Sequence, residues 1–210
     1  MTCRRGSRAN FPDKRDARPL IRQHLGLDDG ALVLAAFGTA NPSRHLNYVV
    51  ASANALARRR IPVFLLNLGA DAPQLSSLDV RVHVHEPGQL PESDLASYLA
   101  SADIFLAPFI DGVSTRRGSM MAALQHGLPI VGTAGPLTDD ALRHAPKALR
   151  LTPVDDPNAF VEAVCELACD EEQRLRMGQD ARALYEGSFD WPVLAHRLVN
   201  TLAMGSGRPM

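Results

Sequence analysis

Short apolar runs alternate with segments of helical spacing along this chain, and this alternation limits the folds open to it. Six segments have the composition of strands, most of them continuously apolar as in strands buried on both faces. They span residues 31–37, 62–68, 80–85, 103–107, 129–132 and 148–151. Helical spacing marks residues 16–25, 46–59, 92–102, 115–126, 157–169, 171–186 and 191–202. The connections are too long for hairpins, so we predict a doubly wound α/β domain, a parallel sheet of about six strands with helices on both faces.

The size and composition of the chain suit a single globular domain. Its 210 residues, 46% of them hydrophobic, suffice for one substantial core. We place this domain at residues 16–203, after a flexible lead-in at residues 1–15 and before a flexible tail at residues 204–210.

Charge and cysteine content exclude several classes of protein. The 22 Lys and Arg nearly balance the 23 Asp and Glu, so no net basic field favours nucleic acid. Three cysteines cannot build a disulfide framework, which favours a reducing compartment and a cytoplasmic location. We expect neither a transmembrane segment nor a signal peptide, because apolar runs are short and the N-terminus is polar and basic. Peripheral membrane contact stays open.

The loop and helix start at residues 111–119 carry the clearest signal for a ligand. Ligands of doubly wound sheets bind outside the carboxyl ends of the strands. Here Ser114 and Thr115 offer hydroxyls, Arg116 and Arg117 offer two cations, and Gly118 permits close approach. A helix N-terminus adds free N–H groups, and together these suit a diphosphate. A capped helix whose arginines face solvent or pair with acids fits the same residues equally well.

Two further loops follow predicted strands. The loop after residue 37 ends in Arg44 at a helix start, where the helix dipole disfavours a cation unless an anion joins it. A solvent-facing arginine is an equal alternative. The loop HEPGQLPE at residues 85–92 has the backbone to seat a flat base, although a plain turn explains its prolines and glycine better.

Other polar residues form no recognisable catalytic or metal-binding set. Cys165 and Cys169 lie one helical turn apart among apolar residues and are typical core filling. His83 and His85 share a strand face without a third ligand, so we predict no metal site. The adjacent pair Asp139 and Asp140 begins a helix. No motif for a P-loop or for triad or zinc hydrolysis is present.

The order of these segments resembles the C-terminal, nucleotide-sugar-binding half of GT-B glycosyltransferases of the retaining group 1 family. The resemblance extends from about residue 16 to residue 202. It rests on LGL at 25–27, FGTANPSR at 37–44, EPG at 86–88, SADIFLAPF at 101–109, AALQHGLPIVGT at 122–133 and FDWPVLAHRL at 189–198.

This resemblance implies a site for a nucleotide-diphosphate sugar. It puts base and ribose near the EPG loop and the AALQHG helix, and the diphosphate on the helix N-terminus at residues 114–119. Arg44 occupies the place of a family lysine that touches phosphate. Fixed N–H groups and cations, rather than a metal or a cofactor, then stabilise the leaving group. The implied donor-binding residues are Gly38, Thr39, Glu86, Pro87, Gly88, Leu90, Gly112, Ser114, Thr115, Gly118 and Ser119.

Two departures from the family pattern bear on activity. The family's paired glutamates, which hold the donor sugar and the ribose, are replaced by Ser114 and Ala122. We hypothesise that Arg116 and Arg117 grip the diphosphate instead, while Asp111 reaches the sugar. The acceptor-binding N-terminal half of a GT-B enzyme is also absent from these 210 residues.

We therefore predict the donor-binding domain of a metal-independent glycosyltransferase of the hexosyltransferase type. Its predicted catalytic residues are Arg44, Arg116, Arg117 and Asp111, and turnover requires an N-terminal acceptor domain or a partner chain. Two alternatives remain: a stand-alone domain that binds a nucleotide or a protein without turnover, and a sugar-nucleotide epimerase-like protein. The epimerase needs acids and histidines in the cleft, and the loops named here offer few.

Overall fold

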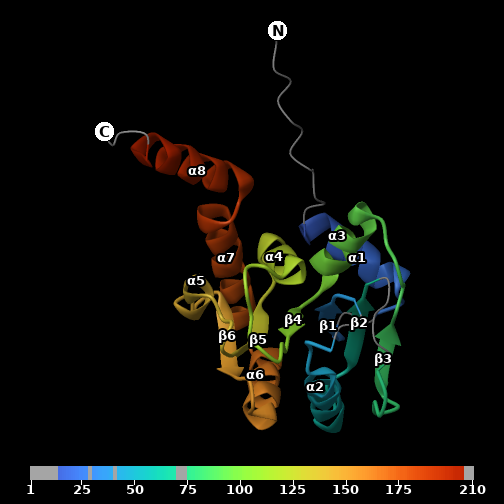
Figure 1. Cartoon of the computed structure of the whole chain (residues 1–210). Helices are drawn as coiled ribbons and strands as arrows, with labels where there is room; N and C mark the ends of the chain where they lie inside the picture. Colours follow the sequence, from blue (N-terminus) through green and yellow to red (C-terminus); the bar gives the residue numbers. More distant parts are fainter. Residues whose placement is uncertain (1–13, 28–29, 40–41, 70–74, 206–210) are drawn as a thin grey trace.

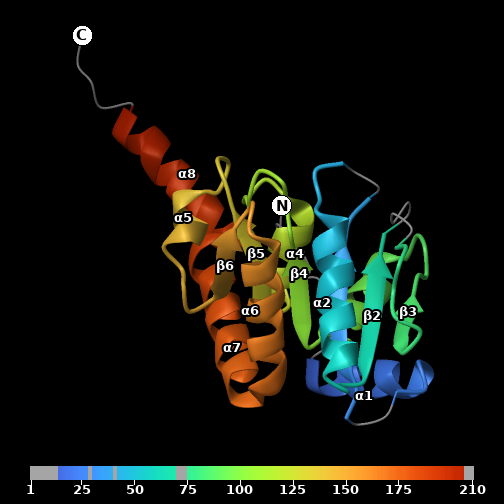
Figure 2. The same ribbon diagram turned by 90° about the horizontal axis from the view of Figure 1, so that it is seen from below.

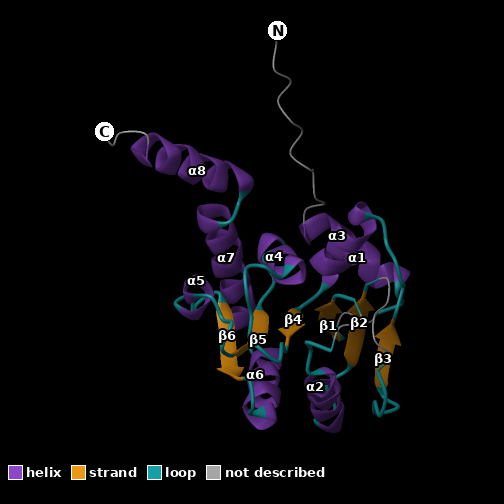
Figure 3. Cartoon of the chain, in the orientation of Figure 1, coloured by secondary structure: helices purple, strands orange, loops and turns teal. Residues whose placement is uncertain are grey.

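A six-stranded parallel sheet forms the centre of the molecule (Figures 1 and 3). The computed structural model describes residues 14–27, 30–39, 42–69 and 75–205. The strands are β1 (Leu32–Phe37), β2 (Val63–Leu68), β3 (Val82–His85), β4 (Ile104–Ala107), β5 (Ile130–Ala134) and β6 (Leu149–Pro153). All neighbouring strands pair in parallel, in the order β3-β2-β1-β4-β5-β6. The predicted doubly wound α/β class is confirmed.

Helices cover both faces of this sheet. In Figure 1, α2 (Leu46–Arg58) and α6 (Pro157–Cys169) lie below the sheet, and α3 (Glu92–Ser101) and α4 (Gly118–Gln125) lie above it. Figure 2 shows α2 and α6 side by side on their face. The remaining helices are α1 (Lys14–His24), which packs on α3, α5 (Asp140–Arg143), α7 (Glu171–Ser188), which packs on α4 and α6, and α8 (Trp191–Gly205).

Strand β1 shows why the apolar runs are continuous. Leu32, Leu34 and Ala36 contribute to the core beneath α2 and α6, whereas Val33 and Ala35 contribute to the core beneath α3 and α4. Successive side chains of a strand point to opposite faces, and here both faces are buried. The strand therefore has no solvent side that would favour polar residues.

A buried charge cluster fixes α1 to the amino end of the sheet. Asp103 accepts a 2.8 Å hydrogen bond from the Val33 N–H and contacts Arg18 at 2.6 Å and Arg22 at 3.5 Å. Arg22 also donates to the Ala31 carbonyl at 2.6 Å. Asp103 directly precedes β4, at the amino ends of the strands, whereas the candidate site lies at their carboxyl ends. The role of Asp103 is therefore structural.

The C-terminal helix is the element that packs least against the rest of the domain. Helix α8 projects away from the sheet in both ribbon views (Figures 1 and 2). Trp191 is 77% exposed, and Leu194, Leu198, Val199 and Leu202 are also exposed along the same helix. No helix in the described part of the chain combines the length and apolarity needed to cross a membrane.

The observed element bounds differ from the predicted ones at a few ends. Helix α1 begins two residues earlier than predicted, β5 and β6 each end two residues later, and α8 continues to Gly205. Helix α4 begins three residues later than predicted, at Gly118 rather than residue 115. Most of the predicted lead-in and tail lies outside the described residues.

Candidate anion site at the carboxyl end of the sheet

The loops that leave β1 and β4 are joined where the strand order reverses. Arg44 and Phe109 form an isolated antiparallel bridge between these loops. The His45 N–H donates to the Pro108 carbonyl at 2.7 Å, and the Ile110 N–H donates to the Ser43 carbonyl at 3.0 Å. Ligands of doubly wound sheets bind at this reversal. The backbone therefore holds Arg44 at the position where such a ligand lies.

Arg44 is a buried cation whose charge lacks a counterpart in the described structure. It is only 8% exposed, and neither Nη1 nor Nη2 has a hydrogen-bond partner among the described residues. Its guanidinium lies over Gly38, where an added Cβ would be 3.2 Å from Nη1. Burial lowers the pKa of Arg44, and the Arg117 cation lowers it further. Both effects disfavour the charge, so the site favours an anion that would offset them.

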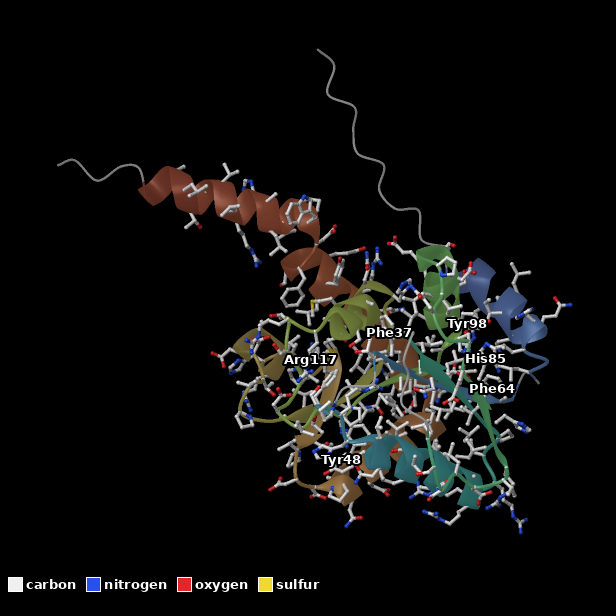
Figure 4. All side chains as sticks on the ribbon, turned by 45° about the vertical axis from the view of Figure 1, so that its right-hand side comes forward. Phe37, Tyr48, Phe64, His85, Tyr98 and Arg117 are labelled. Atoms are coloured by element: carbon white, nitrogen blue, oxygen red, sulfur yellow. The ribbon has the colours of Figure 1, made fainter. Side chains whose placement is uncertain are left out.

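Arg117 lies beside Arg44 but has several partners of its own (labelled in Figure 4). It forms an ion pair with Asp111 and donates to the Ser43 hydroxyl at 3.1 Å. Its guanidinium also stacks over the Phe109 ring, 4.0 Å from the centroid. Arg117 thus helps to hold the β1 and β4 loops together. Of the two predicted phosphate-binding arginines, Arg116 is exposed, whereas Arg117 pairs with an acid as in the alternative interpretation of this segment.

The loops that leave β4 and β5 also meet, through two glycines. A Cβ on Gly112, whose φ is +93°, would lie 2.5 Å from the Gly135 nitrogen. The Leu137 N–H donates to the Asp111 carbonyl at 2.8 Å. This contact brings Asp139 to the β4 loop, where its Oδ2 accepts a hydrogen bond from the Thr115 N–H.

The helix predicted at residues 115–126 is present, but residues 115–117 are not helical. The Ser114 hydroxyl accepts from the Arg116 N–H, and Asp139 of the β5 loop holds the Thr115 N–H, so one local and one tertiary side-chain hydrogen bond replace the first helical turn. Helix α4 begins only at Gly118. Among the described residues, the N–H groups of Gly118 and Ser119 in its first turn have no hydrogen-bond partner, whereas the Thr115 N–H is bonded to Asp139.

The EPG loop lies at the β3 edge, separated from the β4 loop by β2 and β1. Asn67 of β2 donates to Glu86 Oε1 at 2.7 Å, and Gly88 has a φ of +72°. Leu90 packs against the core beneath α3. The structure thus brings Arg44, Asp111, Arg117 and the start of α4 together, while Glu86, Pro87, Gly88 and Leu90 form a second cluster.

Below the EPG loop, His85 lies among aromatic rings (Figure 4). Its Nε2 is 3.0 Å from the Tyr98 hydroxyl, and its ring centroid is 6.4 Å from that of Phe64. Burial lowers the pKa of His85, and the charge of His24 contributes to the shift. These contacts are those of a partly buried histidine that packs against neighbouring rings. Among the described residues, no three His, Cys, Asp or Glu side chains gather as a metal site.

Sequence reasoning missed three residues of the site: Ser43, Phe109 and Asp139. Each acts through a contact between loops that are far apart in the sequence. Phe109 is the last residue of the SADIFLAPF segment, and Asp139 belongs to a predicted helix start. Neither pattern indicates that Phe109 contacts Arg117 or that Asp139 contacts Thr115. The helix start itself is confirmed, since α5 begins at Asp140.

Comparison with known proteins assigns the chain to a family. Residues 31–170 match the family model for glycosyl transferases group 1. The chain therefore belongs to this family, and its fold is the C-terminal, Rossmann-like half of a GT-B glycosyltransferase.

Two curated relatives are mannosyltransferases. A GDP-mannose-dependent monoacylated alpha-(1-6)-phosphatidylinositol monomannoside mannosyltransferase of Corynebacterium glutamicum is 25% identical over 91% of this chain and 52% of its own length. The phosphatidyl-myo-inositol mannosyltransferase of Mycolicibacterium smegmatis is 28% identical over 85% of this chain and 46% of its own. The chain thus spans about half the length of these relatives.

Solved structures share the fold at low sequence identity. Anabaena HepE in complex with UDP and glucose has a TM-score of 0.70 at 16% identity, over 92% of this chain and 55% of its own. The C-terminal domain of LpcC, a group 1 family glycosyl transferase from Francisella tularensis, has a TM-score of 0.69 at 11% identity. That match covers 86% of this chain and 99% of the domain.

Proposed function

We propose that this chain is the donor-binding half of a glycosyltransferase and binds a nucleotide-diphosphate sugar at the β1 and β4 loops. The observation that carries the proposal is Arg44, a buried arginine whose Nη1 and Nη2 have no hydrogen-bond partner among the described residues. A buried, unpaired charge costs about 3–5 kcal/mol. A phosphate offsets that cost with charge-assisted hydrogen bonds.

The start of α4 supplies the second half of the diphosphate site. Gly118 and Ser119 carry first-turn N–H groups, and the positive end of the helix dipole favours an anion there. Ser43, which precedes Arg44, is hydrogen-bonded to Arg117, which precedes Gly118, so the two anion-binding elements lie next to each other. One phosphate on Arg44 and the other on the helix start match the two charges of a diphosphate.

These groups act on the leaving nucleotide diphosphate during sugar transfer. Negative charge grows on the diphosphate as the bond to the sugar breaks. Arg44, the Arg117 cation behind it and the α4 N–H groups are in place before the reaction, so they stabilise that charge without reorganisation. We infer that this chemistry proceeds without a bound metal and without a cofactor other than the donor.

For the donor itself, GDP-mannose is our first choice. One curated relative is GDP-mannose-dependent, and both are mannosyltransferases. The base then lies against Glu86, Pro87, Gly88 and Leu90 at the β3 edge. A UDP-sugar is the second choice, because the neighbouring HepE structure holds UDP and glucose.

Turnover requires an acceptor-binding half, supplied by another domain or chain. The relatives are about twice as long as the matched region, and the exposed apolar residues of α8 offer a surface for such a partner. We further infer a cytoplasmic location.

A domain that binds donor without turnover is the competing candidate, and the observation in its favour is that Ser114 and Ala122 replace the family's acidic residues.

Calorimetric titration of the purified chain with GDP, UDP and ADP, with and without Mg²⁺, tests the proposal. We expect saturable binding of one nucleotide, independent of Mg²⁺, and at least a tenfold loss of affinity in Arg44→Met. Arg150→Met is the matched control, because Arg150 is exposed on β6 and pairs with Glu166 away from the site. Unchanged affinity in Arg44→Met, or no binding of any nucleotide, contradicts the proposal.

A further inference from the structure

Asp139 has an unusual role for a residue at the start of a helix. It occupies the N-cap position of α5, yet its side chain makes no capping hydrogen bond there. The carboxylate instead crosses to the β4 loop and accepts from the Thr115 N–H. We propose that Asp139 holds the sugar of the donor, as the hydrogen-bond acceptor for sugar hydroxyls beside the diphosphate. This inference rests on the proposed donor-binding function.

The position of Asp139 follows from the junction of two loops. The close contacts of Gly112 with Gly135 and Thr138 leave no room for a side chain between the β4 and β5 loops. Gly135 donates its N–H to the Thr138 hydroxyl at 2.9 Å, which fixes the turn that precedes Asp139. The fold therefore holds the Asp139 side chain at Thr115. Thr115 lies three residues before Gly118, the first residue of α4.

The carboxylate has acceptor capacity to spare. It accepts a hydrogen bond from the Thr115 N–H through Oδ2, whereas a carboxylate offers about four lone-pair directions. The hydrogen bond from the Thr115 N–H lowers the pKa of Asp139, and the charge of Arg116 adds to the effect. Asp139 is thus ionised at neutral pH and accepts hydrogen bonds only, as recognition of sugar hydroxyls requires.

The other carboxylates of these two loops are less suited to the sugar. Asp111 was our predicted sugar contact, but it is paired with Arg117 and so helps to hold that cation. Asp140 is exposed in the first turn of α5. A sugar attached to a phosphate at the α4 start lies next to residues 114–115, and Asp139 is the described carboxylate bound there.

Asp139→Asn tests this assignment without removing the tie to Thr115. The amide oxygen of Asn still accepts from the Thr115 N–H, whereas the second oxygen becomes an NH₂ donor. Asp140→Asn is the matched control, one residue away and exposed. The measurement is the ratio of the Kd values for GDP and GDP-mannose, repeated with UDP and UDP-glucose, for wild type and both variants.

We expect wild type to bind the sugar nucleotide at least tenfold more tightly than the diphosphate. Asp139→Asn should lose most of that ratio while its affinity for the diphosphate changes less than twofold, and Asp140→Asn should match wild type. Equal losses for both ligands mean that Asp139 only orders the loop, and a wild-type ratio near one means that no sugar contact exists; either result overturns the assignment. If no nucleotide binds to wild type, the proposed function itself fails, and this inference fails with it.

Discussion

Gly112 and Gly135 touch where the loops leaving β4 and β5 meet, and this contact shapes one wall of the candidate site. A Cβ at Gly112 would lie 2.5 Å from the Gly135 nitrogen and closer still to the Thr138 hydroxyl. Gly112 also has a φ of +93°, which L side chains rarely adopt. The junction therefore depends on the absence of a side chain at both positions.

Gly112→Ala is expected to destabilise the domain by about 2 kcal/mol or more, because strain at positive φ adds to the clash with backbone atoms. Urea denaturation measures the loss. Gly135→Ala should behave in the same way, since its Cβ would lie 2.7 Å from the Asp111 carbonyl carbon. A stability equal to wild type in both variants would show that the two loops do not pack as described.

Gly118→Ala is expected to separate binding from stability. A Cβ at Gly118 meets no atom within 4 Å, and alanine favours helix over glycine by about 1 kcal/mol. The variant should therefore fold with equal or greater stability. Its affinity for the nucleotide should fall by about tenfold or more, because the added methyl group occupies the space where a phosphate approaches the α4 N–H groups. Calorimetry and urea denaturation on the same samples measure both, and unchanged affinity would remove Gly118 from the site.

Arg44→Met should stabilise the unliganded domain, although we expect it to weaken nucleotide binding at least tenfold. The substitution replaces a buried cation that has no described partner with an apolar side chain of similar length. We expect a gain of about 1–3 kcal/mol in the free energy of unfolding. Addition of the nucleotide should then raise the midpoint of wild type more than that of the variant. A loss of stability in Arg44→Met would indicate that the guanidinium already has a structural partner.

The sheet was predictable because its strands are buried on both faces. A run such as residues 62–68 has no polar side, and such runs separated by helical spacing leave few arrangements other than a parallel doubly wound sheet. All six predicted strands match the observed ones to within two residues at each end. The strand predicted at residues 148–151 extends to Pro153, because β6 pairs with β5 along its whole length.

The site was predictable only in part, because its geometry depends on contacts between distant loops. The sequence identified Arg44, Asp111 and Arg117 as candidates, and the structure brings these three together. It could not show that Arg117 pairs with Asp111 and stacks on Phe109 while Arg44 stays unpaired. The start of α4 was misplaced for the same reason, since a tertiary bond from Asp139 holds the Thr115 N–H outside the helix.

Asp103→Asn should be strongly destabilising, although Asp103 lies far from the candidate site. The substitution removes the charge that faces Arg18 and Arg22, and the Arg22 side chain is only 9% exposed. Loss of one partner of a buried ion pair costs about 3–5 kcal/mol. Glu162→Gln is the control, because its pair with Arg59 is exposed and should contribute less than about 1 kcal/mol. Urea denaturation of both variants measures the difference, and similar losses would contradict a buried role for Asp103.

The environment of His85 predicts a loss of stability in mild acid. Burial lowers the pKa of this residue, so the folded state resists protonation, whereas the unfolded state binds the proton near the ordinary pKa of about 6.5. Between these two pKa values the unfolded state carries more protons, and the free energy of unfolding falls as pH decreases below about 6.5. His24, Tyr98 and Phe64 face the ring from α1, α3 and β2, and none of them supplies a carboxylate that would stabilise the imidazolium.

His85→Gln should flatten this pH dependence, and His83→Gln should leave it unchanged. His83 lies two residues away on the same strand but is exposed, so it controls for a change in the number of histidines. The measurement is the urea midpoint of wild type and both variants at several pH values between 5 and 8. Only wild type and His83→Gln should lose stability steeply below pH 6.5. If the urea midpoint depends on pH equally in all three proteins, protonation of His85 does not contribute to the loss of stability, and another group is responsible.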